Sequence, residues 1–212
     1  MIKCPSAFAW LGMAMLVAVL GACRPAADPA PVSAQWVKID ADGTPALVDM
    51  QRHHCVFDQR TGLMWEVKRH DSALHHPAHT FTWHSSDEQL HMSDPGLPDG
   101  GDCSVARCDT EGLAAAVNAA GLCGYRDWRV PTRAELLTLG DLSLRQTGQV
   151  IDPAFFPQLV VDEYWTIETF RLYPQSAWAV SARHGLDRAD LKREPKPVRL
   201  VRRHLPAQGD EP

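Results

Sequence analysis

Histidine is the residue type with the most evident chemical potential in this chain, because eight of its ten histidines lie between His53 and His91. His75, His76 and His79 fall within five consecutive positions. Neutral imidazoles at this density bind zinc or nickel readily. The sequence has no His-Glu-x-x-His motif, however, and no carboxylate is held near these histidines on a predicted helix. We therefore expect neither a metal site nor another cofactor, and a histidine-rich metal-binding protein remains an alternative.

Four cysteines, Cys55, Cys103, Cys108 and Cys123, lie in the part of the chain that we expect to fold. Their spacings of 47, 4 and 14 intervening residues lack the paired Cys-x-x-Cys knuckles of a zinc site, so two disulfides are expected in an oxidising compartment. A predicted helix between Cys108 and Cys123 would hold these two about 15 Å apart, and a disulfide needs Cα atoms within about 7 Å. The preferred pairing is Cys103 with Cys108 and Cys55 with Cys123, although the sequence leaves the connectivity open.

The first 23 residues have the features of an export signal. Lys3 supplies a positive charge, and the uncharged run Ala7–Leu20 is too short to cross a membrane, which takes about 20 residues. The run ends in Leu20-Gly21-Ala22-Cys23, which resembles the lipobox of bacterial lipoproteins. We expect cleavage before Cys23 and a diacylglycerol on its thiol, which makes the membrane a partner. Arg24, rather than an aspartate, follows the cysteine and favours the outer membrane of the cell envelope.

Charge is distributed unevenly along the chain. The formal net charge is −5, so we expect no binding to nucleic acid. Residues 183–203 nevertheless hold eight basic and three acidic side chains. Arginine recognises sulfates and other anions through paired hydrogen bonds, so an anionic or glycosaminoglycan-like polysaccharide would fit this segment. A solvated strand edge explains the same charges more simply. The anion-binding candidates are Arg188, Arg193, Arg199, Arg202 and Arg203.

Turn and cap signals predict the elements that position these residues. A β-hairpin around Gly62 is expected from residues 55–58 and 63–67. One helix is expected over Glu111–Ala120, capped by Asp109 or Thr110, and another begins at the capping box Thr132-Arg133-Ala134-Glu135. Residues 69–107 are expected to form a long loop. Further strands are expected at 80–83, 127–130, 164–167, 177–181 and 198–203. This order is typical of an α+β fold.

Several sequence blocks, taken in order, resemble one known family. The blocks are Arg60-Thr61-Gly62-Leu63-Met64-Trp65-Glu66, residues 123–132 (CGYRDWRVPT), residues 151–157 (IDPAFFP), Tyr164-Trp165 and residues 198–202 (VRLVR). They resemble the C-terminal domain family of the Legionella collagen-like adhesin over about residues 48–203. The chain has no collagen-like Gly-X-Y tract, and Leu200 stands where the family usually has a cysteine, so the family's disulfide pattern cannot be copied.

The resemblance implies a fold and a location. The implied fold is similar to the C-type-lectin and formylglycine-generating-enzyme group, with two helices beside a curled, mixed β-sheet and long loops. It also implies secretion or surface exposure and, for the adhesin itself, binding of sulfated glycosaminoglycans. The Glu-Pro-Asn, Gln-Pro-Asp and Trp-Asn-Asp motifs of calcium-dependent lectins are absent from the sequence.

We expect four segments. They are a signal peptide (1–22), a lipidated cysteine with a Pro/Ala-rich tether (23–47), the folded domain (48–204) and a tail (205–212). Because the sequence has no Gly-x-Ser-x-Gly motif, P-loop or paired carboxylates, we expect a lipid-anchored, non-enzymatic binding module with affinity for anionic polysaccharide. An enzyme of the formylglycine-generating type, which would need reactive cysteines, is the other alternative.

Aromatic and charged residues inside the family blocks have a simple structural interpretation. Trp65, Trp128 and Trp165 could stack on a sugar, but each stands among apolar neighbours, where a tryptophan normally fills the core. Asp127 and Arg129 flank Trp128 and are expected to form a structural ion pair or to anchor a turn rather than to do chemistry.

Overall fold

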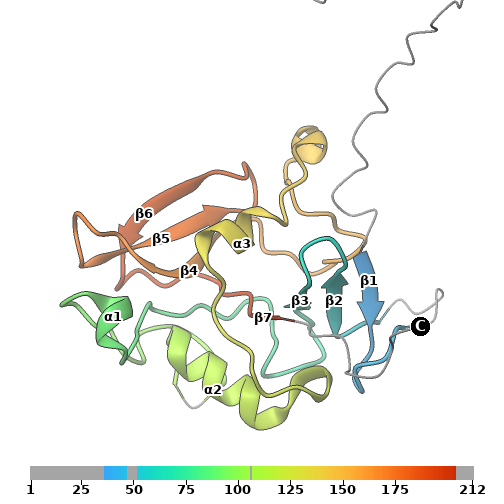
Figure 1. The fold of residues 1–212 in the computed structure, drawn as a ribbon, viewed down its shortest axis with the longest axis horizontal. Coiled ribbons are helices and arrows are strands. Elements are labelled where there is room, and N and C mark those ends of the chain that lie inside the picture. The colour runs from blue at the N-terminus through green and yellow to red at the C-terminus, as the bar shows by residue number, and fades with distance from the viewer. Residues whose placement is uncertain (1–35, 47–51, 106, 204–212) are drawn as a thin grey trace, which may run out of the picture.

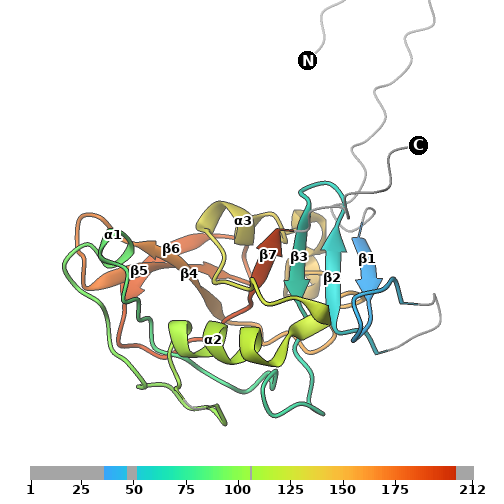
Figure 2. The same ribbon diagram turned by 60° about the horizontal axis from the view of Figure 1, so that its bottom comes forward.

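Two open antiparallel sheets form the framework of the domain (Figure 1). The computed structural model describes residues 36–46, 52–105 and 107–203. Figure 2 shows the two sheets at opposite ends of the molecule, with helix α2 (Thr110–Ala120) below the region between them. The α+β class predicted from the sequence is therefore confirmed.

The first sheet contains the predicted hairpin. Its strand order is β1 (Trp36–Ile39), β2 (Cys55–Asp58), β3 (Leu63–Glu66) and β7 (Val201–Arg203). In the turn between β2 and β3, the Asp58 carboxylate accepts a hydrogen bond from the backbone N–H of Arg60 at 2.9 Å. Gly62 has a φ of 69°, a left-handed conformation that a side chain would strain. The turn is thus specified by residues within it.

The second sheet has the order β4 (Glu163–Thr169), β5 (Ser176–Ser181) and β6 (Asp187–Leu191). Strands β4 and β5 contain the segments expected at 164–167 and 177–181, whereas β6 was not predicted. All strand pairs in both sheets are antiparallel, which corrects the expectation of a mixed sheet. Parallel pairing needs a crossover of a dozen or more residues, which the short turns β2–β3, β4–β5 and β5–β6 do not supply.

Both predicted helices begin at their predicted caps. The Asp109 side chain accepts a hydrogen bond from the Gly112 N–H at 2.7 Å at the start of α2. Helix α3 (Arg133–Leu137) begins with the capping box, because Thr132 and Glu135 each accept a hydrogen bond from the other's backbone N–H. The additional helical segments are α1 (Glu88–His91), η2 (Leu122–Gly124) and η3 (Leu142–Thr147). The first of these interrupts the long loop expected over residues 69–107.

The tryptophans of the family blocks fill the core, as predicted. Trp65, Trp128 and Trp165 are at most 2% exposed. Two of them also satisfy their polar N–H groups, because the Nε1 of Trp128 donates to the carbonyl of Leu122 and that of Trp165 donates to the carbonyl of Phe81, both at 3.0 Å. A buried indole needs such a partner to avoid the cost of an unpaired donor.

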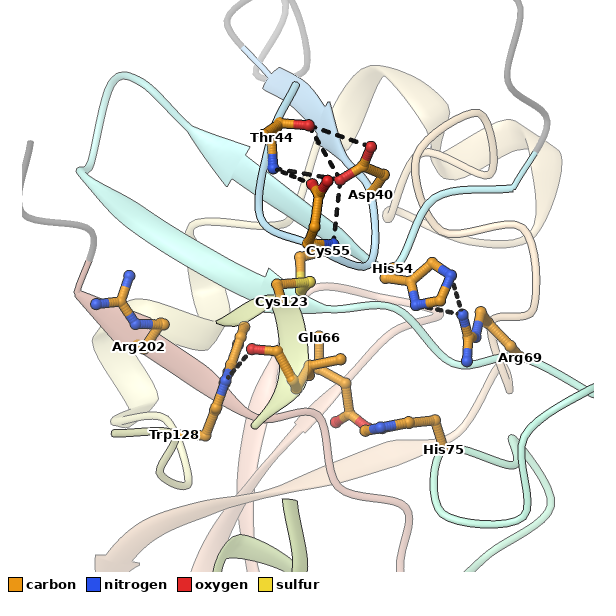
Figure 3. Close-up of a disulfide and its surroundings, with 12 residues drawn as sticks. Asp40, Thr44, His54, Cys55, Glu66, Arg69, His75, Cys123, Trp128 and Arg202 are labelled. Carbon is orange, nitrogen blue, oxygen red and sulfur yellow. Dashed lines mark hydrogen bonds and ion pairs between the residues drawn. A yellow bond between two sulfur atoms is a disulfide. The ribbon is translucent and has the colours of Figure 1, made fainter. Parts of the chain in front are cut away.

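Two disulfides fasten the loops to this framework. Cys55–Cys123 joins β2 to the turn after α2, and Cys103–Cys108 closes a small loop before α2. The pairing is the one preferred from the sequence. Figure 3 shows Cys55–Cys123 close to Trp128 and above Glu66, and Cys55 pairs with Glu66 where β2 begins and β3 ends.

The folded part begins earlier than predicted. Strand β1 lies within the expected tether of residues 23–47, yet it pairs with β2, and its residues Trp36 and Ile39 are buried. Residues 80–83 and 127–130 form isolated bridges in place of the expected strands, and residues 198–200 precede β7. Residues 1–35, with the expected lipidation site Cys23, and residues 204–212 lie outside the described residues. Among the helices of the described ranges, none has the length and hydrophobicity needed to cross a bilayer.

Candidate anion-binding site

Two of the five predicted anion-binding arginines are buried, which corrects their assignment. Arg199 is 1% exposed, and its Nη1 donates a hydrogen bond to the backbone oxygen of Glu66 at 2.6 Å. Its guanidinium carbon lies 4.5 Å from the ring centre of Phe156. Arg202 is also buried, and its Nε donates to the Asp127 carboxylate at 2.6 Å. A polymer cannot reach either guanidinium group, so both arginines serve the fold. The Asp127 pair is one of the structural ion pairs expected from the sequence.

The remaining three candidates are divided between the two sheets, with Arg188 and Arg193 on or just after β6 and Arg203 on β7. Arg188 on β6 forms an ion pair with Glu163 at 2.7 Å. Arg193 pairs at 3.5 Å with the acidic residue that follows it. Arg203 is exposed at the end of β7, in the other sheet. The five arginines of the C-terminal basic segment therefore do not form one binding surface, because two are buried and the other three are divided between the two sheets.

A pocket that sequence reasoning missed lies beside the chain that leaves β3. Its volume is about 210 Å³, and it is lined by Arg52, His53, Val67, Lys68, Arg69, His70, Asp71, Pro157 and Gln158. The sequence does carry one signal for it, the run Lys68-Arg69-His70 directly after a strand. That run is shorter than the C-terminal basic segment and stands within the histidine-rich stretch, so the sequence does not set it apart as a binding site.

Two guanidinium groups at this pocket share one carboxylate. The Nη1 of Arg52 lies 3.8 Å from an Asp71 oxygen, and the Nε of Arg69 lies 3.5 Å from the other oxygen. Arg69 also contacts the ring nitrogens of His54, and Figure 3 shows these two side chains facing each other. Because one carboxylate neutralises one unit charge, this group of side chains retains an excess positive charge.

His53 lines the pocket with one ring nitrogen that lacks a hydrogen-bond partner. Its Nε2 is 2.6 Å from the carbonyl oxygen of Phe155, which can only accept, so Nε2 carries the proton. Burial lowers the pKa of His53, and the hydrogen bond to Phe155 opposes this shift only in part, so the ring is neutral at pH 7. The Nδ1 atom is therefore a bare acceptor, buried without a hydrogen-bond partner.

Next to the pocket, Glu66 joins Lys68 and His75 in a buried charged cluster. The Nζ of Lys68 and the Nδ1 of His75 each lie 2.7 Å from the same Glu66 oxygen, and the Leu200 N–H donates to the other oxygen at 3.0 Å. Burial opposes ionisation of Glu66, but the charge of Lys68 and the hydrogen bond from His75 hold its pKa well below the ordinary value. Lys68 therefore lines the pocket with its charge neutralised.

The loop histidines do not gather into a metal site. The Nδ1 of His70 is 3.4 Å from the Nε2 of His76, while His79 contacts the Ser104 hydroxyl at 3.3 Å. Within the part of the chain that the structure describes, no group of three or more His, Cys, Asp or Glu side chains is arranged to hold a metal ion. The described residues therefore give no structural support to the alternative of a histidine-rich metal-binding protein.

Comparison with known protein families gives a match to the Lcl C-terminal domain over residues 54–202. The matched region begins at the edge of β2 and ends within β7, so it includes both sheets except for β1. Every residue that lines the pocket falls inside it except Arg52 and His53. No curated protein and no solved structure matches the chain significantly.

Proposed function

Because the chain belongs to the Lcl C-terminal domain family, we propose that it is a non-enzymatic, lipid-anchored module that binds anionic polysaccharide at the bacterial cell envelope. The family is associated with an adhesin, which suggests a cell-surface or envelope location. The α+β fold with two open antiparallel sheets is compatible with kinship to the C-type-lectin and formylglycine-generating-enzyme group, and that kinship is part of the proposal.

The observation that carries the proposal is the charge at the pocket beside β3. Arg52 and Arg69 meet there with only the Asp71 carboxylate shared between them. The Arg52 side chain is 85% exposed, so an anionic group of a polymer can approach it from solvent. The proposed contact is therefore this pocket rather than the C-terminal basic segment, whose buried arginines already have protein partners.

The lipid anchor on Cys23 and the outer-membrane location rest on sequence signals. The order Leu20-Gly21-Ala22-Cys23 and the short apolar run before it support the anchor. Metabolic labelling with a palmitate analogue should mark the protein, and Cys23→Ala should abolish the label. Labelling that survives this substitution would reject the anchor without affecting the proposed binding.

An enzyme of the formylglycine-generating type is disfavoured by the state of the cysteines. Such an enzyme would need reactive thiols. Cys55, Cys103, Cys108 and Cys123 are the cysteines of the described residues, and all four are joined in disulfides. A disulfide sulfur has no thiolate to offer as a nucleophile.

A direct test uses three polymers that share one backbone. The full-length protein, purified in detergent, is passed over immobilised dextran, carboxymethyl-dextran and dextran sulfate. We expect retention on at least one charged polymer at low salt and none on dextran. High salt should release the protein, because the screening length falls from about 10 Å at 0.1 M to about 3 Å at 1 M. Passage through both charged columns, or equal retention on dextran, would refute the function.

A pair of matched variants locates the contact. Arg52→Gln removes a cation at the pocket, and Arg193→Gln removes one that is 70% exposed elsewhere on the surface. We expect earlier elution for Arg52→Gln and unchanged elution for Arg193→Gln. If both variants elute with the unmodified protein, the pocket is not the binding site.

A further inference from the structure

We propose that the pocket beside β3 binds a single acidic sugar residue, through its carboxylate and one of its hydroxyl groups. This inference rests on the proposed function and names the ligand of the same site. Three properties of the pocket lead to it, namely its size, its charge and two buried polar atoms without hydrogen-bond partners.

The size of the pocket fits one sugar ring. Pockets for drug-sized molecules measure about 300–1,000 Å³. This pocket measures about 210 Å³, below that range. That space suits one pyranose ring with its substituents, and a longer saccharide would extend into solvent.

The charge of the pocket selects a monoanion. Lys68 is neutralised by Glu66, which leaves the guanidinium groups of Arg52 and Arg69 opposed by Asp71 alone. A planar carboxylate can turn both of its oxygens toward guanidinium N–H groups. A sulfate ester carries the same charge on three terminal oxygens, one more than the paired N–H groups of a guanidinium can accommodate. The pocket therefore favours a carboxylate.

Two buried atoms at the pocket, one hydrogen-bond donor and one acceptor, match the carboxylate and a hydroxyl group of an acidic sugar. The Nε of Arg69 has the ion pair with Asp71 at 3.5 Å but no hydrogen bond, and the Nδ1 of His53 is an acceptor without a hydrogen-bond partner. Leaving such atoms unpaired is costly, so a ligand that pairs them gains affinity. Both atoms are shielded from solvent in the free protein, so pairing them requires a side-chain rearrangement of the kind that commonly accompanies binding. An ionised carboxylate can pair with Arg69 but has no proton for His53, whereas a sugar hydroxyl can donate to it.

Calorimetric titration of the full-length protein in detergent tests this ligand. The probes are glucuronate, glucose and glucose 6-sulfate, which share a pyranose ring and differ in the group at one carbon. We expect saturable binding of glucuronate in the millimolar range and no binding of glucose. Binding of glucose 6-sulfate should be weaker by about tenfold, as expected when one charge-assisted hydrogen bond is replaced by a poorly placed oxygen.

Variants connect the binding to the pocket. Arg69→Gln should weaken glucuronate binding about tenfold, because it removes one charge-assisted contact. Since Arg69 also contacts His54, this variant is checked for folding by circular dichroism. Arg52→Gln, at a highly exposed side chain, provides a second test that does not depend on folding. Arg193→Gln is the control and should bind like the unmodified protein.

The outcomes separate this inference from the proposed function. Absence of glucuronate binding, equal binding of glucose 6-sulfate, or insensitivity to Arg52→Gln would overturn the acidic-sugar ligand. Retention on charged dextrans in any of those cases would leave the polysaccharide-binding function standing. Glucuronate binding without retention on either charged dextran would instead support the ligand and refute the polymer-binding function.

Discussion

Replacing Glu66 with glutamine keeps the size of a fully buried side chain but removes its charge. In the folded protein the carboxylate accepts hydrogen bonds from Lys68 and His75, each at 2.7 Å, and from the Leu200 N–H at 3.0 Å. The glutamine amide has one oxygen for these donors, and its NH2 group would face a donor. Lys68, which is 4% exposed, would be left as a buried ammonium without a counter-charge.

The expected cost is a large part of the stability of the domain. Breaking a buried ion pair by removing one partner typically costs about 3–5 kcal/mol. Domains have about 5–15 kcal/mol of unfolding free energy in total. For a chain of this size each kcal/mol moves the Tm by about 2–4 °C, so Glu66→Gln should lower it by roughly 6–20 °C. Lys68→Met replaces the cation with an apolar side chain and tests the other half of the pair.

A double-mutant cycle measured by urea denaturation separates the interaction energy between Glu66 and Lys68 from the contacts that each makes with its other neighbours. Because an apolar replacement of a whole buried pair is often neutral or stabilising, Glu66→Gln/Lys68→Met should be more stable than Glu66→Gln alone. The reasoning fails if Glu66→Gln costs less than about 1 kcal/mol, the level of an exposed ion pair. It also fails if the double variant is no more stable than Glu66→Gln.

The same pair predicts how stability depends on acid. The pKa of Glu66 is lowered in the folded protein from its ordinary value of 4.5. The unfolded chain therefore takes up a proton at this position at higher pH than the folded chain. The stability contributed by Glu66 is complete above about pH 4.5 and is lost as the pH falls toward the lower folded value. In Glu66→Gln this part of the acid-induced loss should disappear.

Three further variants test the two disulfides and the cap of α3. Chain-entropy arguments give about 4 kcal/mol for the Cys55–Cys123 disulfide, whose cysteines are 68 positions apart, and about 2 kcal/mol for Cys103–Cys108, which are 5 apart. Replacing each pair with alanines and comparing urea midpoints should reproduce this order, and equal losses would contradict it. Thr132→Ala should cost about 1 kcal/mol by removing the side-chain acceptor at the start of α3, and an unchanged urea midpoint would show that the cap does not stabilise the helix.

Features that depend on neighbours in the sequence were predictable. Asp109 and Thr132 accept hydrogen bonds from N–H groups three residues later, and Gly62 lies in a turn anchored by Asp58. In each case the donor and the acceptor lie within the same few residues. Local spacing therefore contains the necessary information, and the hairpin and both helices follow from it.

Strands that depend on distant partners were missed. Strand β1 (Trp36–Ile39) follows a Pro/Ala-rich stretch, and its burial comes from packing against Phe155 and Phe156, more than one hundred positions away. Strand β6 (Asp187–Leu191) is an edge strand that contains three charged residues in five. Edge strands tolerate charges because one side of the strand is open to solvent. Neither strand has the alternating apolar pattern on which a prediction from sequence depends.

The anion-binding site was expected in the wrong segment for a related reason. A count of charges along the chain does not show which charges lie at the surface. The basic C-terminal segment finds its counter-charges in remote elements, since Arg202 pairs with Asp127 and Arg188 pairs with Glu163. Arg199 is withdrawn from solvent altogether. At the pocket beside β3, by contrast, both guanidinium groups compete for Asp71. The shorter basic run therefore presents an exposed arginine at a pocket, whereas two arginines of the longer run are buried within the fold.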